Sequence, residues 1–378
     1  MIKIYWYRHS MENRNDLLRF GLMRLHLTKE IIYIEQDISK AVLAGFSKKV
    51  SSDKHHHLSF LLLENKSDST KIIVDNEDSF IHCSPYLKEA DYYFTAAYNR
   101  DFYKNKEFPK VYGWQKEDDI SWYQSESLSI IKRLSDHFYK VKPFIPIAPN
   151  LTSGEKKPHF NQSMINAASR ISNFFKKRNY WSPALNDFEK RYNTILSLRN
   201  NALKYDVILS DTLWGWPKHR IRLHRKLAKL SGTYRINTIL NWHPPYIHDG
   251  SVNTKIDNRD FPLRSGEVIT NYEKMLSESK LGTFATGFHW GWRNIMTFSL
   301  CVGIPIVTDK PIFEPYFDFN KFRVFYNEDG EWNDIRPLLD KITPEYWEQT
   351  KIHNQLIYDQ YLAPETVARY LIETAAGK

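Results

Sequence analysis

The sequence predicts an α/β protein made of two strand-and-helix halves followed by a helical tail. Two observations support this prediction. Short β-rich apolar runs alternate with stretches of helical period twice along the chain, and an extended, helix-breaking segment at residues 141–149 lies between the two series. The length of 378 residues also suits two domains. In the first half, short strands separated by helices favour a mainly parallel sheet covered on both faces.

The first series begins at the N-terminus. Helical periodicity predicts helices over residues 16–27 and 127–139. Two further helices are expected between about residues 151 and 201, with the interdomain connection among them. The predicted strands cover residues 2–7, 31–35, 58–63, 71–74 and 92–94.

The second series begins at residue 207 and ends in the tail. Proline at the start of the last helix is typical of a helix N-terminus. The division into domains is expected at 1–185, 186–345 and 346–378, with the last segment packing back on the first domain. The predicted strands cover residues 207–210, 236–240, 283–286 and 304–307, and the predicted helices 217–230, 266–279, 293–301, 346–361 and 365–374.

Composition limits the classes of protein. With 42% hydrophobic and 15% aromatic residues, the chain can fill its cores and is not disordered. Its two cysteines, Cys83 and Cys301, are far apart, which excludes a disulfide framework and fits a reducing compartment. We see no signal peptide or membrane-spanning run and expect a cytoplasmic protein. The net charge of +9 favours anionic partners such as nucleotide phosphates, nucleic acid or acidic lipid.

A glycine-containing loop offers the strongest functional signal. It follows the strand at residues 283–286 and opens the next helix. Backbone amides at such a helix start can hold a phosphate, and Gly287 and Gly291 allow the phosphate to come close to the backbone. The guanidinium of Arg293 adds a positive charge that can bind a pyrophosphate through two hydrogen bonds. His289, inside the loop, is a further candidate for contact with such a ligand. The alternative is a tight turn whose tryptophans and histidine fill the core.

This stretch resembles the donor-binding half of GT-B glycosyltransferases, in particular the exostosin-like group. The matching residues are Tyr272, the Ser-Lys-Leu at 279–281, Gly287, Arg293 and the Gly-Ile-Pro-Ile-Val at 303–307. The resemblance implies two Rossmann-like domains that face a cleft, with the donor on the second domain and the acceptor on the first.

The resemblance fails at the ribose-binding position of this helix. Many relatives carry a glutamate seven residues before the proline, and this sequence has Phe298 there. We therefore expect the ribose contact to come from Asp309 or Glu314, or the donor class to differ.

An acidic turn follows the strand at residues 71–74. Its carboxylates are Asp75, Glu77 and Asp78. Ligands bind at the carboxyl ends of strands in open α/β sheets, and a sugar hydroxyl needs a base as it attacks, so one of these residues is a candidate catalytic base. The equally weighted alternative is a solvated Asx turn in which Asp78 or Ser79 caps a helix.

The predicted helix over residues 217–230 is basic. Arg222, Arg225 and Lys229 share one face by their spacing and are candidates for donor phosphate contacts. The alternatives are a solvated face or a patch that binds nucleic acid or lipid.

Metal and other enzyme motifs are weak or missing. The histidines at 55–57 diverge from one another and lack an acidic partner at ligand spacing, so we expect no metal site. The sequence has no phosphate-loop, dinucleotide, zinc-protease or serine-hydrolase signature.

Together these patterns predict a hexosyltransferase-like enzyme that is independent of metals and cofactors. It would move a sugar from a nucleotide-sugar donor to a glycan or lipid-linked acceptor in surface polysaccharide or lipopolysaccharide synthesis. Aromatic and basic residues interleave at 138–144 and 174–181 and predict peripheral binding to the anionic inner face of a membrane. The alternative function is a noncatalytic nucleic-acid-binding protein, which is disfavoured because the basic residues are confined to patches.

Overall fold

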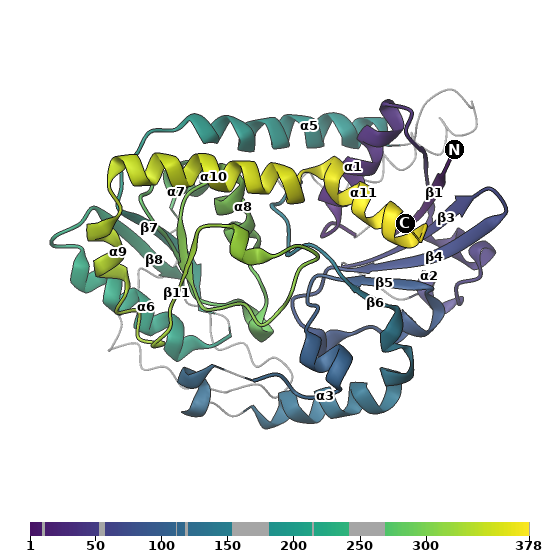
Figure 1. Ribbon diagram of the computed structural model, residues 1–378, viewed down its shortest axis with the longest axis horizontal. Coiled ribbons are helices and arrows are strands. Elements are labelled where there is room, and N and C mark those ends of the chain that lie inside the picture. Colours follow the sequence, from purple (N-terminus) through teal and green to yellow (C-terminus); the bar gives the residue numbers. More distant parts are fainter. Residues whose placement is uncertain are drawn as a thin grey trace.

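The chain folds into two α/β halves, and its last two helices cross from the second half back to the first (Figure 1). The computed structural model describes residues 1–9, 12–52, 57–110, 112–117, 120–152, 181–213, 215–241 and 269–377. The strands are β1 (Lys3–Arg8), β2 (Ile32–Asp37), β3 (Leu58–Asn65), β4 (Asp68–Asp75), β5 (Tyr92–Thr95), β6 (Val141–Pro143), β7 (Val207–Thr212), β8 (Ile236–Asn241), β9 (Gly282–Phe284), β10 (Ile306–Thr308) and β11 (Val324–Tyr326). The helices are α1 (Asp16–Leu27), α2 (Lys49–Ser52), α3 (Ser121–Leu134), α5 (Ser182–Ser197), α6 (Pro217–Leu230), α7 (Tyr272–Ser277), α8 (Asn294–Val302), α9 (Ile335–Lys341), α10 (Pro344–Leu362) and α11 (Pro364–Ala375).

The sheet of the first half contains six strands in the order β2-β1-β3-β4-β5-β6. Five of them point in one direction, and β3 runs antiparallel to both of its neighbours. β3 and β4 form a hairpin in which Asn65 pairs with Asp68. The sequence analysis treated these strands as separate and missed their pairing. A link of two residues can join only antiparallel strands, because a parallel connection needs a dozen or more.

Helices cover both faces of this sheet, as predicted. Alternate strand residues point to opposite faces. Ile4 and Trp6 of β1 belong to a core shared with α1, α5 and α11, whereas Phe60 and Tyr93 belong to a core shared with α3 and several 3-10 turns.

The second half has a fully parallel arrangement of five strands. β7 pairs with β8, and β9, β10 and β11 form a neighbouring sheet. The backbone amides of Lys280 and Leu281 donate to the carbonyls of Tyr205 and Asp206, at 2.9 and 3.1 Å, which joins the two sheets at β7 and β9. The resulting strand order is β8-β7-β9-β10-β11. The chain adds β8 on one side of β7 and the later strands on the other side, so the strand order reverses between β7 and β9 while all strands stay parallel. Doubly wound sheets of this kind bind ligands at the carboxyl ends of the strands beside that reversal.

The helical tail connects the two halves. α10 packs on α8 of the second half, and α11 packs on α1 of the first. Arg24 of α1 forms an ion pair of 2.8 Å with Glu365, and Arg369 pairs with Glu30 at 2.9 Å. The fold is therefore the predicted α/β fold with two Rossmann-like halves and a helical tail. α5 runs continuously across the predicted limit at residues 185 and 186.

Within the described ranges, the model contains no helix that is both long and apolar enough to cross a membrane.

Candidate functional site

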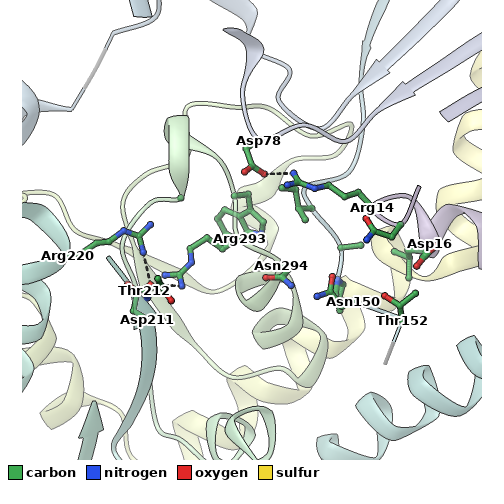
Figure 2. A pocket seen from close by; sticks show the side chains of 17 residues that line it. Arg14, Asp16, Asp78, Asn150, Thr152, Asp211, Thr212, Arg220, Arg293 and Asn294 are labelled. Carbon is green, nitrogen blue, oxygen red and sulfur yellow. Dashed lines mark hydrogen bonds and ion pairs between the residues drawn. The ribbon is translucent and has the colours of Figure 1, made fainter. Parts of the chain in front are cut away.

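A cavity of about 550 Å³ lies between the two halves at the carboxyl ends of their strands (Figure 2). We call it the interdomain cavity. The first half contributes the loop after β1 and the acidic turn after β4, and the second half contributes the ends of β7 and the loop between β9 and α8. The lining residues used below are Asn13, Arg14, Asp16, Asp78, Asn150, Thr152, Asp211, Arg220, Gly287, Arg293 and Asn294.

The second-half wall is organised around Asp211, a buried residue next to the end of strand β7. Its Oδ1 accepts hydrogen bonds from Arg220 at 2.6 Å and from Arg293 at 2.7 Å. Burial alone would raise the pKa of Asp211, but Arg220 and Arg293 outweigh burial and hold it below its ordinary value. Asp211 is therefore an ionised anchor for two arginines and a poor proton acceptor.

The two arginines differ in whether each nitrogen of the guanidinium has a hydrogen-bond acceptor. Arg220 also donates to the carbonyls of Gly215 and Thr286, each at 2.9 Å, so every nitrogen of its guanidinium has an acceptor. The Nη1 of Arg293 is buried and has no hydrogen-bond partner among the described residues. A buried charged donor without a partner is costly, which favours an anionic ligand at Arg293.

Gly287 and the start of α8 lie beside Arg293. The amide of Gly287 donates to the carbonyl of Gly291 at 2.8 Å. A Cβ at position 287 would lie 2.5 Å from that carbonyl oxygen, so the turn requires glycine. α8 begins at Asn294 with Arg293 in the N-cap position, and its first amides have no acceptor within a helix. The helix dipole adds to the positive charge of Arg293, so this corner suits a phosphate group.

The first-half wall presents Asp78 and Arg14, which form an ion pair of 3.1 Å (Figure 2). Burial raises the pKa of Asp78 to about 6, against the opposing charge of Arg14. The neighbouring Glu77 pairs with His57 at 2.9 Å, and that bond outweighs burial and lowers the pKa of Glu77 to about 2. Asp78 is thus the member of the acidic turn that lines the cavity and can change its protonation near neutral pH.

Asp75 faces the core of the first half and does not line the interdomain cavity. Its side chain accepts hydrogen bonds from the Tyr93 hydroxyl and the Glu77 amide. Burial raises the pKa of Asp75 to about 6. Asp75 is the last residue of β4, and its side chain points into the core. Asp78 lies three residues further along the turn and lines the cavity instead.

The predicted basic face of α6 points away from the cavity. Arg222 pairs with Glu331 at 3.1 Å, and Arg225 and Lys229 are exposed. The cavity contact comes instead from Arg220, in the first turn of the helix. Only the N-terminal end of α6 lies at the carboxyl edge of the sheet, so the basic residues Arg225 and Lys229, further along the helix, are directed to solvent.

Tyr272 of the matched motif and His289, the separate candidate for donor contact, lie outside the cavity lining. Tyr272 begins α7, and burial raises the pKa of its hydroxyl. His289 is buried at the contact between the halves, where its Nδ1 lies 3.0 Å from the Tyr123 hydroxyl. Gly287 and Arg293 are the motif residues that line the cavity.

The two residues expected near a ribose also lie elsewhere. Asp309 is buried and bonded to His219, the Thr286 amide and Asn327, each at 2.9 to 3.0 Å. Glu314 pairs with Arg100 at 3.0 Å on the surface. Phe298 is a core residue of α8.

The sequence analysis did not single out four charged residues of the cavity, Arg14, Asp16, Asp211 and Arg220. Asp211 could have been found from the sequence, because it follows the predicted strand at residues 207–210. Arg14 and Asp16 follow the first predicted strand in the same way. Arg220 had no such signal, because its role depends on reaching back to β7.

In the described part of the chain, no group of three or more histidine, cysteine or acidic side chains is arranged to hold a metal ion. His55 and His56 lie outside the described residues.

The first of the two predicted membrane segments is divided between core and surface. Phe138 and Phe144 are buried, and Tyr139 is 73% exposed. In the second segment, residues 174–180 lie outside the described residues, and Trp181 is buried.

Comparison with known proteins adds weak structural similarities. No protein-family model and no curated protein sequence matches the chain. Among solved structures, Alr3699/HepE of Anabaena in complex with UDP-glucose aligns over 100% of both chains with 11% identity and a TM-score of 0.37. The spinosyn forosaminyltransferase SpnP aligns over 98% of both chains with 9% identity and a TM-score of 0.36. The wall teichoic acid polymerase TagF covers 77% of this chain and 59% of its own, with 11% identity and a TM-score of 0.25. Similarities this low do not identify the function of the chain.

Proposed function

We propose that this protein is a glycosyltransferase that transfers a sugar from a nucleotide-sugar donor to a hydroxyl of an acceptor. The observation that carries the proposal is the unpaired, buried Nη1 of Arg293 at the N-terminus of α8, in a cavity whose other wall holds Asp78. A cavity of about 550 Å³ is also of a size that encloses a nucleotide-sized ligand.

In this proposal the donor diphosphate binds Arg293 and the first amides of α8 and lies against Gly287. The acceptor hydroxyl loses its proton to Asp78 as its oxygen bonds to the anomeric carbon, and the bond from that carbon to the diphosphate breaks. Arg293 and the helix dipole stabilise the charge that develops on the departing diphosphate. Because the protein supplies this positive charge, the proposed reaction requires no metal ion and no cofactor.

The acceptor is proposed to be a glycan or a lipid-linked sugar used in surface polysaccharide synthesis, as the resemblance to the exostosin-like group implies. Asn13, Asp16, Asn150 and Thr152 also line the cavity, and their side chains suit a ligand rich in hydroxyl groups. Peripheral attachment to an anionic membrane belongs to the same proposal and is supported by the exposed Tyr139 beside Lys140.

Calorimetric titration with UDP, GDP, ADP and dTDP tests the donor site. We expect at least one nucleoside diphosphate to bind. Arg293→Ala should weaken that binding by about 10- to 100-fold, because a charge-assisted hydrogen bond contributes about 1.5–3 kcal/mol. Lys229→Ala, on the exposed end of α6, is the matched control and should bind like the wild type. Equal affinity in Arg293→Ala and wild type, or no binding of any of the four nucleotides, would contradict the proposal.

A further inference from the structure

The acidic turn is tied to the loop before α1 by several side-chain hydrogen bonds. The side-chain amide of Asn76 donates to the carbonyl of Arg14 at 2.6 Å, and the side-chain amide of Asn15 donates to the carbonyl of Val74, near the end of β4, at 3.4 Å. The Arg14 guanidinium then reaches the Asp78 Oδ1 at 3.1 Å. These contacts join segments that follow β1 and β4, so the position of Asp78 depends on Arg14 as well as on its own turn.

The carboxylate of Asp78 keeps one oxygen available. Arg14 occupies Oδ1, and in the described ranges Oδ2 has no hydrogen-bond partner. The side chain is 23% exposed in the cavity wall. The charged groups that face it are Arg14 from the loop before α1, His57 just before β3, and Glu77 of its own turn. His57 is paired with Glu77, which leaves Arg14 as the cation bonded directly to Asp78.

We propose that Arg14 is a positioning residue, which directs Oδ2 of Asp78 toward the acceptor hydroxyl and keeps the carboxylate ionised. This inference rests on the proposed function. In the reaction, Oδ2 takes the hydroxyl proton while Oδ1 stays bonded to Arg14. The acceptor oxygen forms its bond to the anomeric carbon, and the electron pair of the breaking bond leaves with the diphosphate.

Removal of Arg14 should change the titration of Asp78 in a defined direction. Burial favours the protonated form of Asp78, with a pKa of about 6, and Arg14 opposes burial. An adjacent arginine lowers the pKa of an aspartate by about 1 to 3 units, so Arg14→Gln should raise it by at least about one unit. A rise of about two units, the middle of that range, would place the pKa near 8 and leave the base about 10% ionised at pH 7, which predicts roughly a tenfold loss of activity at pH 7 that disappears by pH 9.

The direct test is carboxyl ¹³C NMR of protein labelled at aspartate side chains, with the Asp78 signal assigned from Asp78→Asn. We expect a midpoint near pH 6 in the wild type and a higher one in Arg14→Gln, with Arg14→Lys between them. Arg100→Gln, which removes the surface pair with Glu314, is the matched control and should leave the midpoint unchanged. The same midpoint in Arg14→Gln and wild type would overturn the role of Arg14.

Activity separates this inference from the proposed function. Hydrolysis of UDP-glucose, GDP-mannose and dTDP-glucose is followed from pH 5 to 9, with water as the acceptor. We expect Asp78→Asn to lose activity at every pH and Arg14→Gln to lose it mainly below pH 8. A uniform loss across the pH range in Arg14→Gln would indicate a purely structural role and overturn the inference. Full activity in Asp78→Asn, or no hydrolysis of any of the three donors, would overturn the proposed function, and the inference with it.

Discussion

Arg220 and Arg293 bind the same carboxylate oxygen and yet serve different purposes. Each nitrogen of the Arg220 guanidinium donates to a protein acceptor, and these bonds fix the end of β7 against the loop after β9. Arg293 donates to Asp211 through Nη2, and its buried Nη1 has no hydrogen-bond partner among the described residues. The sequence could predict Arg293 from its place after a glycine turn. It could not predict Arg220, because the helical period of α6 groups residues by face and does not show which end of the helix meets the cavity.

Glu12 supplies a prediction about the pH dependence of stability. Burial raises the pKa of Glu12 to about 7, despite the charge of Arg8 and hydrogen bonds from Ser59 and Trp6. A carboxyl group whose pKa is higher in the folded state destabilises that state as pH rises through 4.5 to 7. Glu12→Gln should therefore increase the free energy of unfolding at pH 8 by up to about 3 kcal/mol, and by little at pH 4.

Urea denaturation at the two pH values measures this effect. Gln at position 12 can still accept a hydrogen bond from Trp6, so the comparison isolates the charge. Glu373→Gln, at an exposed position of α11, is the control and should show no such pH-dependent gain. A stability of Glu12→Gln below that of the wild type at pH 8 would contradict the prediction.

At the scale of elements, the sequence predicted helices better than strand pairings. α1 and α6 occupy the residues expected from their apolar spacing, because a helix is determined by contacts three and four residues apart. The hairpin of β3 and β4 was missed because its turn, Lys66 and Ser67, carries none of the usual glycine signals. Strand order depends on contacts between distant segments, which periodicity does not contain.

The contact between α1 and α11 predicts the effect of a single methyl group. A Cβ at Gly21 of α1 would lie 1.9 Å from the carbonyl oxygen of Pro364 at the start of α11. Gly21→Ala should therefore displace α11 and lower the free energy of unfolding by about 1–3 kcal/mol. Gly232→Ala is the matched control, since its Cβ would meet nothing within 4 Å, and its change should stay within about 0.5 kcal/mol. Equal melting temperatures for the two variants would contradict this account.

At the scale of the whole molecule, the loop between β9 and α8 joins the two halves. Trp290 belongs to the second half by sequence but packs in the core of the first, where its Nε1 donates to Gln115 at 3.0 Å. Trp290 stacks on Phe80, and the preceding His289 contacts Tyr123. The same short loop therefore carries Gly287 and Arg293 at the cavity and fixes their position relative to the acidic turn across from them.

The packing of Trp290 in the core of the first half predicts cooperative unfolding of the two halves. Scanning calorimetry of the wild type should show one transition, since the halves share core residues. Trp290→Ala should lower stability by about 3–5 kcal/mol and split the transition in two, because it removes a large side chain from the shared core. Tyr139→Ala, at an exposed aromatic residue, is the control and should keep the single transition. A single, unshifted transition in Trp290→Ala would show that Trp290 does not couple the unfolding of the two halves.

The crossing of α11 onto α1 also has a consequence for how the protein is made. Arg24 and Glu365 are 341 residues apart in sequence, yet they pair in the finished molecule. Ribosomes add about 5–20 residues per second, so the apolar face of α1 waits on the order of tens of seconds for its partner helix. Until α11 emerges, the first half exposes a surface to which chaperones or another nascent chain can bind. The first half is therefore completed late, although its residues are synthesised first.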